Sequence, residues 1–138
     1  MVEARSSGSC VATAPTEIAG GTARWLGSCP AGRAEGLGVL RVGAREPFGF
    51  LVGRMKAGRP VSGLIFKPSG NYMEAVAFDG RGRAILADGE HVQQEDALWA
   101  TAARAARNVA ERFADDGNRN SASYYRRLAY RIEHDRPE

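Results

Sequence analysis

Two cysteines and two histidines are the residues of this chain best suited to redox, metal or covalent chemistry. Cys10 and Cys29 are too far apart for a C-x-x-C redox motif, and they supply only half of a metal ligand set. In an exported protein such a pair oxidises to a disulfide, which restrains the unfolded chain by roughly 3 kcal/mol. We therefore expect a Cys10–Cys29 disulfide. The alternative is two unrelated buried thiols in a cytosolic protein.

The histidines give weaker signals for a reactive site. His91 follows Asp88 and Glu90, which could indicate a metal site, but polar residues before a helix are typical of capping. His134 lies among charged residues at the end of an expected helix, where a solvated side chain is the simpler interpretation. The chain has no Gly-x-Ser-x-Gly nucleophile motif, and the Gly80–Arg83 stretch is too short for a dinucleotide fingerprint. We expect no enzymatic activity, no metal and no cofactor. The alternative is a small hydrolase in which the fold joins His91 to an acid and a serine.

The charge is unevenly distributed along the chain. The net charge is +3, yet residues 1–89 hold 11 Lys or Arg against 7 Asp or Glu, and residues 90–138 hold 8 against 9. Binding to nucleic acid needs an unbalanced basic surface, and the arginine-rich C-terminal part is balanced. Nucleic acid is therefore not expected as a partner, whereas the basic first part favours an acidic one.

The elements that would position these residues change in character at Gly89. Between 22 and 89, short apolar runs alternate with glycine turns, which predicts a meander of about six short strands. The Pro68–Asn71 turn predicts a hairpin between residues 64–66 and 72–78. Alternation within the second strand places its even-numbered residues on one face, namely Tyr72, Glu74, Val76 and Phe78.

Residues 93–116 lack glycine and proline, so they predict a long helix that ends at Gly117. Its apolar face consists of Leu98, Ala102, Ala105, Val109 and Phe113. We expect Arg107 to pair with Glu111 along the outer face. A second helix is expected from Asn120 or Ser121, either of which could cap it, to about His134. Its buried stripe is expected to be Tyr125, Leu128 and Ile132.

Together these patterns predict a mainly β fold with α, in which a meander of antiparallel hairpins precedes a C-terminal helical hairpin. Residues 1–20 are small and polar, so we expect a flexible segment anchored by Cys10. Residues 21–89 would form the β-repeat domain, and residues 90–138 a helical cap in the same compact unit.

Three degenerate units repeat within the β region, each an aromatic strand, a glycine turn and a second apolar strand. They begin at Trp25, Phe50 and Asn71. This pattern resembles the MORN repeat family over roughly residues 10–89, and the opening with Cys10 and Cys29 is similar to exported bacterial members. Two departures are Ser62, which takes a glycine position, and a missing glycine after Tyr72. The resemblance implies a hairpin solenoid whose open end needs a cap.

The glycines also have a direct physical explanation. Gly32 is expected at a turn, while Gly36 and Gly38 are expected to leave room for an aromatic side chain across the bare backbone. Trp25, Phe50 and Tyr72 would be these aromatics. The alternative for the three is a row that binds a ligand.

These observations favour an exported binding module, periplasmic or secreted, whose signal peptide has been removed ahead of Met1. Its partner would be another protein with an acidic surface, as for an inhibitor or immunity protein against a toxin or envelope enzyme. The alternative is a peripheral module that binds anionic lipid. The candidate binding residues are Arg33, Arg54, Arg59 and Arg81 in the β region and Arg126, Arg127 and Tyr130 in the second helix.

Overall fold

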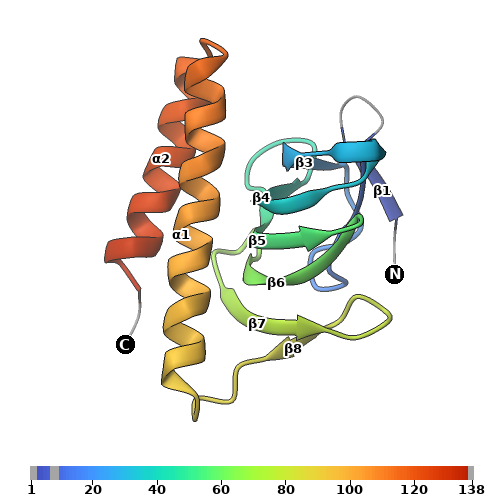
Figure 1. Ribbon diagram of the computed structural model, residues 1–138, viewed down its shortest axis with the longest axis vertical. Helices are drawn as coiled ribbons and strands as arrows, with labels where there is room; N and C mark the ends of the chain where they lie inside the picture. Colours follow the sequence, from blue (N-terminus) through green and yellow to red (C-terminus); the bar gives the residue numbers. More distant parts are fainter. Residues whose placement is uncertain (1–2, 7–9, 137–138) are drawn as a thin grey trace.

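A computed structural model describes residues 3–6 and 10–136 of the chain. A six-stranded antiparallel sheet, with strands in the order β3-β4-β5-β6-β7-β8, carries two antiparallel helices along one face (Figure 1). A separate two-stranded sheet, β1-β2, precedes it. The predicted meander of hairpins followed by a helical hairpin is therefore confirmed.

Short strands and tight turns build the sheet. The first two strands are β1 (Glu3–Ser6) and β2 (Cys10–Thr13). The large sheet contains β3 (Ala23–Ser28), β4 (Glu35–Val42), β5 (Gly49–Lys56), β6 (Arg59–Phe66), β7 (Tyr72–Phe78) and β8 (Ala84–Leu86). A 3-10 turn, η2 (Pro30–Gly32), connects β3 to β4. Within each sheet, consecutive strands thus pair as antiparallel hairpins.

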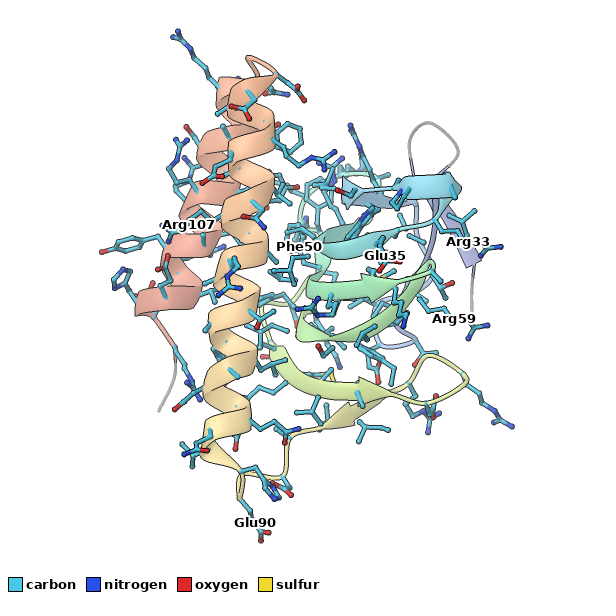
Figure 2. The ribbon with its side chains drawn as sticks, viewed as in Figure 1. Arg33, Glu35, Phe50, Arg59, Glu90 and Arg107 are labelled. Carbon is cyan, nitrogen blue, oxygen red and sulfur yellow. A yellow bond between two sulfur atoms is a disulfide. The ribbon has the colours of Figure 1, made fainter. Side chains whose placement is uncertain are left out.

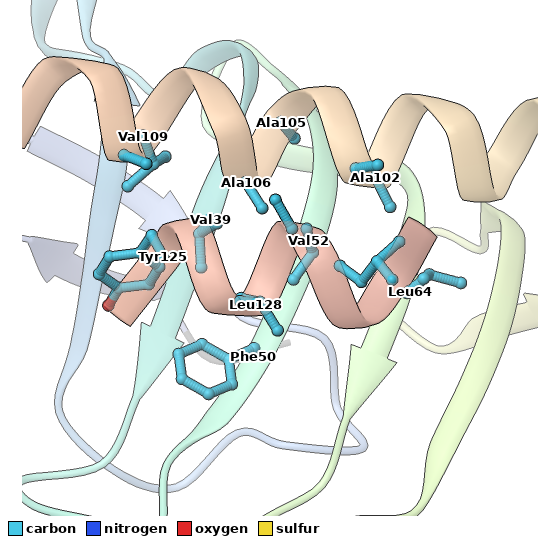
Figure 3. Packing of buried hydrophobic residues seen from close by; sticks show 14 of the residues in the cluster. Val39, Phe50, Val52, Leu64, Ala102, Ala105, Ala106, Val109, Tyr125 and Leu128 are labelled. Carbon is cyan, nitrogen blue, oxygen red and sulfur yellow. The ribbon is translucent and has the colours of Figure 1, made fainter. Parts of the chain in front are cut away.

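The sheet is buried on both faces, because alternate residues of each strand point to opposite sides. On β5, Phe50 and Val52 pack under the helices (Figure 3). Leu51 and Met55 of the same strand belong to the core on the opposite face, with the N-terminal residues. Two hydrophobic cores therefore lie on either side of one sheet.

The helices follow their predicted faces. Helix α1 (Val92–Asp115) buries its predicted stripe, with Phe113 half-buried, and Gly117 follows it with φ +80°. Helix α2 (Arg119–His134) buries Tyr125, Leu128 and Ile132 as predicted. Two details of the prediction were wrong: Asn118 caps α2 in place of Asn120 or Ser121, and Arg107 pairs with Glu133 of α2 in place of Glu111.

Trp25 explains the glycines around it. A methyl group at Gly38 would lie 2.8 Å from the Trp25 ring and 2.7 Å from the Leu26 carbonyl oxygen, and one at Gly27 would also meet the indole. Gly32 lies at the predicted turn with φ +79°. Gly36 differs from the prediction: its surroundings are open, and its φ of +84° is what favours glycine.

The predicted hairpin between β6 and β7 is also present, with one change of face. Phe66 pairs with Tyr72, and Gly63 pairs with Ala75. An irregularity between Ala75 and Ala77 shifts the register against β8, so Phe78 packs with the core opposite the helices. A bulge of this kind ends strict alternation, and the sequence pattern placed Phe78 on the wrong side.

Candidate functional site

Alternate turns of an antiparallel meander lie at the same end of the sheet. Arg33 follows the β3–β4 turn, Arg59 the β5–β6 turn, and Arg81 lies in the β7–β8 turn. Lys56 and Arg83 flank two of these turns, and all five side chains are exposed. Figure 2 shows Arg33 and Arg59 at the end of the sheet that points away from the helices. We call these five residues the basic end.

Backbone hydrogen bonds from the N-terminal segment join the first two of these turns. The amide of Ala34 donates to the Val11 carbonyl (3.0 Å), and the amide of Gly58 donates to the Ala34 carbonyl (2.9 Å). The amide of Thr13 donates in turn to the Gly58 carbonyl (2.8 Å). Arg33 precedes Ala34 and Arg59 follows Gly58 in the sequence. The hydrogen bonds therefore fix the backbone of Arg33 relative to the backbone of Arg59.

The same segment reaches the third turn. The amide of Thr16 donates to the Gly82 carbonyl at 3.0 Å, and the Ala84 amide donates to Oε2 of Glu17 at 2.9 Å. A disulfide between Cys10 and Cys29 anchors the start of the segment to the β3–β4 connection. From residue 10 onward the N-terminal part is thus a paired and largely buried element. The expected flexible start also covers residues 1–2 and 7–9, which lie outside the described residues.

The carboxylates near the basic end are engaged by backbone amides. Glu35 accepts from the Ala57 amide at 3.0 Å, and Asp79 accepts from the amides of Arg81 (2.8 Å) and Arg83 (3.0 Å). These two amides, with smaller contributions from the charges of the same arginines, lower the pKa of Asp79. Each acid therefore organises a turn.

Within residues 3–6 and 10–136, no salt bridge joins the five residues of the basic end to a carboxylate. Placed on turns at the same end of the sheet, these cations create a positive field there. Such a surface can attract and orient an acidic partner.

Arg54 lies apart from the turns. It points from β5 to the helix-bearing face, where a shallow hollow of about 210 Å³ also includes Ser62 and Gln94. Lys56 follows two residues later on the same face, so Arg54 borders the basic end without belonging to the turns.

The predicted α2 residues lie on a different element from the basic end. Arg126, Arg127 and Tyr130 are exposed, and the Tyr130 ring lies 4.2 Å from the ring of His134. The seven predicted binding residues therefore separate into a group at the basic end, Arg54 beside it, and a group on the helical hairpin.

An aromatic groove of about 410 Å³ opens between the helical hairpin and the opposite end of the sheet. Its aromatic walls are Phe48, Phe50, Phe66, Tyr72, Trp99 and Tyr124. The Trp99 indole donates a 2.6 Å hydrogen bond to Oε2 of Glu74 and meets the Tyr72 ring edge-on. Of the three predicted aromatic staples, Trp25 covers glycine backbone, whereas Phe50 and Tyr72 line this groove.

The histidines lie at exposed places. Nδ1 of His91 is 3.1 Å from Oδ1 of Asp88, and both side chains are more than half exposed. Hydrogen bonds from the Glu90 amide and His91 lower the pKa of Asp88. Among the described residues, no group of three or more His, Cys, Asp or Glu side chains is placed to hold a metal ion.

The arrangement also includes residues that were not predicted. These are Lys56 and Arg83 at the basic end and Arg131 in the wall of the aromatic groove. Their positions in the sequence could have indicated them. Lys56 and Arg83 flank turns at the same end of the sheet as Arg33, and Arg131 follows Tyr124 by two helical turns.

Comparisons with known proteins identify no relative: no family model, curated protein or solved structure matches the chain. Of the helices in the described part, none has the length and hydrophobicity that a membrane crossing requires.

Proposed function

We propose that the chain is an exported protein-binding module whose basic end contacts an acidic surface of its partner. The observation that carries this proposal is that Arg33, Arg59 and Arg81 lie on three separate turns at one end of the sheet, and none of them forms a salt bridge with a carboxylate of the described residues. Charges at the rim of an interface act mainly on the rate and specificity of association, and salt screens them. Binding should therefore weaken as the ionic strength rises.

The disulfide supports an oxidising location, which we propose to be the periplasm or the exterior of a bacterial cell. A narrower proposal is an inhibitor or immunity protein whose basic end covers an acidic site on a toxin or envelope enzyme. We also propose a relationship to MORN repeats. Each of its three sequence units corresponds to one hairpin: β3–β4, β5–β6 and β7–β8.

The test is a matched capture experiment from an envelope extract of the source organism. The bait variants are the unaltered chain, a triple reversal (Arg33→Glu, Arg59→Glu, Arg81→Glu) and a control reversal away from the basic end (Arg45→Glu, Arg104→Glu, Arg119→Glu). We expect a stoichiometric acidic protein with the unaltered and control baits and its loss with the triple reversal. Equal retention by all three baits, or no stoichiometric protein, would contradict the proposal.

Anionic lipid is the second candidate, because the same five cations would also attract a negatively charged membrane surface. Co-sedimentation with vesicles of phosphatidylglycerol and phosphatidylcholine separates the two. Binding that depends on the anionic lipid and on the three arginines, without a captured protein, would replace the protein partner with a membrane.

A further inference from the structure

Two arginines face each other on the sheet at the end opposite the basic end. Arg24 of β3 and Arg41 of β4 are direct register partners. Both point to the helix-bearing face, because Leu26 and Val39, two residues away on the same strands, lie in the core under the helices. Like charges directly opposite each other on a sheet are destabilising. The chain therefore carries an electrostatic cost at this position.

Among the residues that the structure describes, no carboxylate is close enough to relieve this repulsion. The salt bridges within residues 3–6 and 10–136 join other groups, so no described carboxylate oxygen lies within 4 Å of either guanidinium. Arg24 is exposed, and the Arg41 guanidinium lies 4.7 Å from the centre of the Phe48 ring. The aromatic ring attracts the Arg41 guanidinium but supplies no opposite formal charge.

The Tyr125 hydroxyl is a third hydrogen-bond donor, beside the guanidinium groups of Arg24 and Arg41. Its side chain is 2% exposed, and the hydroxyl has no hydrogen-bond partner of normal geometry. The Tyr125 ring meets Phe50 edge-on at 6.4 Å, and Phe50 is the register partner of Arg41 on β5. Burial raises the pKa of Tyr125, and the charge of Arg41, a hydrogen bond from the Arg41 side chain and the charge of Arg24 oppose that rise. A guanidinium has no acceptor, so neither arginine can take the hydroxyl proton.

A hollow beside Arg24 offers room for a ligand, while Arg41 and Tyr125 lie outside its lining. The hollow of about 230 Å³ is lined by Arg24 together with Arg112 and Phe113, and the Phe113 ring stacks on Tyr125 at 5.6 Å. Arg112 donates to Oγ of Ser28 at 3.3 Å. Asp116 is the acid in this hollow, so the wall contains two arginines and one carboxylate.

We propose that Arg24, Arg41 and the Tyr125 hydroxyl bind an oxyanion, either a carboxylate or a phosphate group. Such a group offers several acceptor lone pairs to the two guanidinium groups, which have none, and to the hydroxyl proton of Tyr125. It also neutralises the like-charged pair. The anion is a free ion or an acidic group on a larger molecule, and the chemistry at the site is the same. This site is separate from the basic end.

An NMR titration with inorganic phosphate, and separately with acetate, tests the site at constant ionic strength adjusted with sodium chloride. We expect saturable shifts at the amides of residues 24, 41 and 125. Arg41→Gln should weaken binding by about tenfold or more, because it removes a charge-assisted hydrogen bond. Tyr125→Phe should weaken it by a smaller factor, and Arg104→Gln on the outer surface of α1 should leave it unchanged.

Response to phosphate alone would assign a phosphate, and response to both would assign the shared oxyanion chemistry. Saturable binding of neither, or equal shifts with chloride, would overturn the proposal.

A stability measurement provides an independent readout. In anion-free buffer, Arg24→Gln should raise the melting temperature because it removes the repulsion from Arg41. In saturating phosphate this gain should disappear or reverse, because the unaltered chain then binds the anion better. An effect of Arg24→Gln that is the same in both buffers would mark a purely structural residue and would contradict the proposal.

Discussion

The amide of Gly58 donates a 2.9 Å hydrogen bond to the carbonyl of Ala34, which joins the two turns that carry Arg59 and Arg33. Val11 and Thr13 of β2 extend this chain of hydrogen bonds on either side. Backbone hydrogen bonds with the N-terminal segment therefore hold the turns of the basic end in place. These bonds do not involve the arginine side chains.

Reduction of the Cys10–Cys29 disulfide should loosen this arrangement. The bond closes a loop with a sequence separation of 19, and its loss should lower the free energy of unfolding by about 3 kcal/mol. Denaturant unfolding with and without a reductant measures this change. Amide hydrogen exchange should speed up at Thr13 and Ala34 before it does so in α1. Mass spectrometry must first show that the disulfide is present before the reductant is added. If reduction then leaves the stability unchanged, this expectation is contradicted.

Gly38→Ala should destabilise the fold by about 1–3 kcal/mol, because the added methyl group would overlap the Trp25 ring and the Leu26 carbonyl oxygen. Gly80→Ala is the matched control, since that position has open surroundings, and it should change stability by less than about 0.5 kcal/mol. Urea unfolding of both variants gives the comparison. Similar values for the two would show that Trp25 does not depend on the bare backbone of Gly38.

Asn118→Ala should lower stability by about 1 kcal/mol, because the Asn118 side chain accepts a 3.1 Å hydrogen bond from the Ser121 amide at the start of α2. Asn120→Ala tests one of the two residues that the sequence offered as a cap, and its expected effect is within about 0.5 kcal/mol. Thermal unfolding of the two variants decides which asparagine caps the helix. A larger loss for Asn120→Ala would reverse the assignment.

Asp79 should make stability depend on pH in the acid range. Its pKa is lower in the folded chain than in the unfolded chain, mainly because the Arg83 and Arg81 amides bond to its carboxylate. Its contribution is therefore present above the unfolded pKa of about 3.9 and is lost as the pH falls through the lower folded value.

Asp79→Asn keeps an oxygen at this position and removes the titration. The stability difference between the unaltered chain and this variant should shrink as the pH is lowered from neutral into the acid range. A difference that stays constant over that range would show that Asp79 does not titrate differently in the folded chain.

The sequence predicted the helices and hairpins well because their signals are local. The apolar stripe of α1 and the turn at Pro68–Asn71 each depend on residues within a few positions of one another. The errors arose where a distant partner decided the outcome. Arg107 had a suitable acid one turn away at Glu111, yet Glu133 of α2 is its partner, and a local bulge reversed the face of Phe78.

The candidate site was only partly predictable for the same reason. The turns that carry Arg33, Arg59 and Arg81 could be located from the sequence, and antiparallel pairing then brings them to one end. The pairing of Arg24 with Arg41 depends on strand register, and the burial of the Tyr125 hydroxyl depends on how α2 lies over β5. Neither relationship leaves a periodic signal in the chain.

The affinity for the captured partner at two salt concentrations tests whether the basic end is the interface. The comparison uses the unaltered chain, the triple reversal of Arg33, Arg59 and Arg81, and the control reversal of Arg45, Arg104 and Arg119. We predict that the triple reversal weakens binding by at least about tenfold and removes most of the salt dependence, while the control reversal changes neither. Equal losses in the two variants, or salt-independent binding by the unaltered chain, would contradict an interface at the basic end.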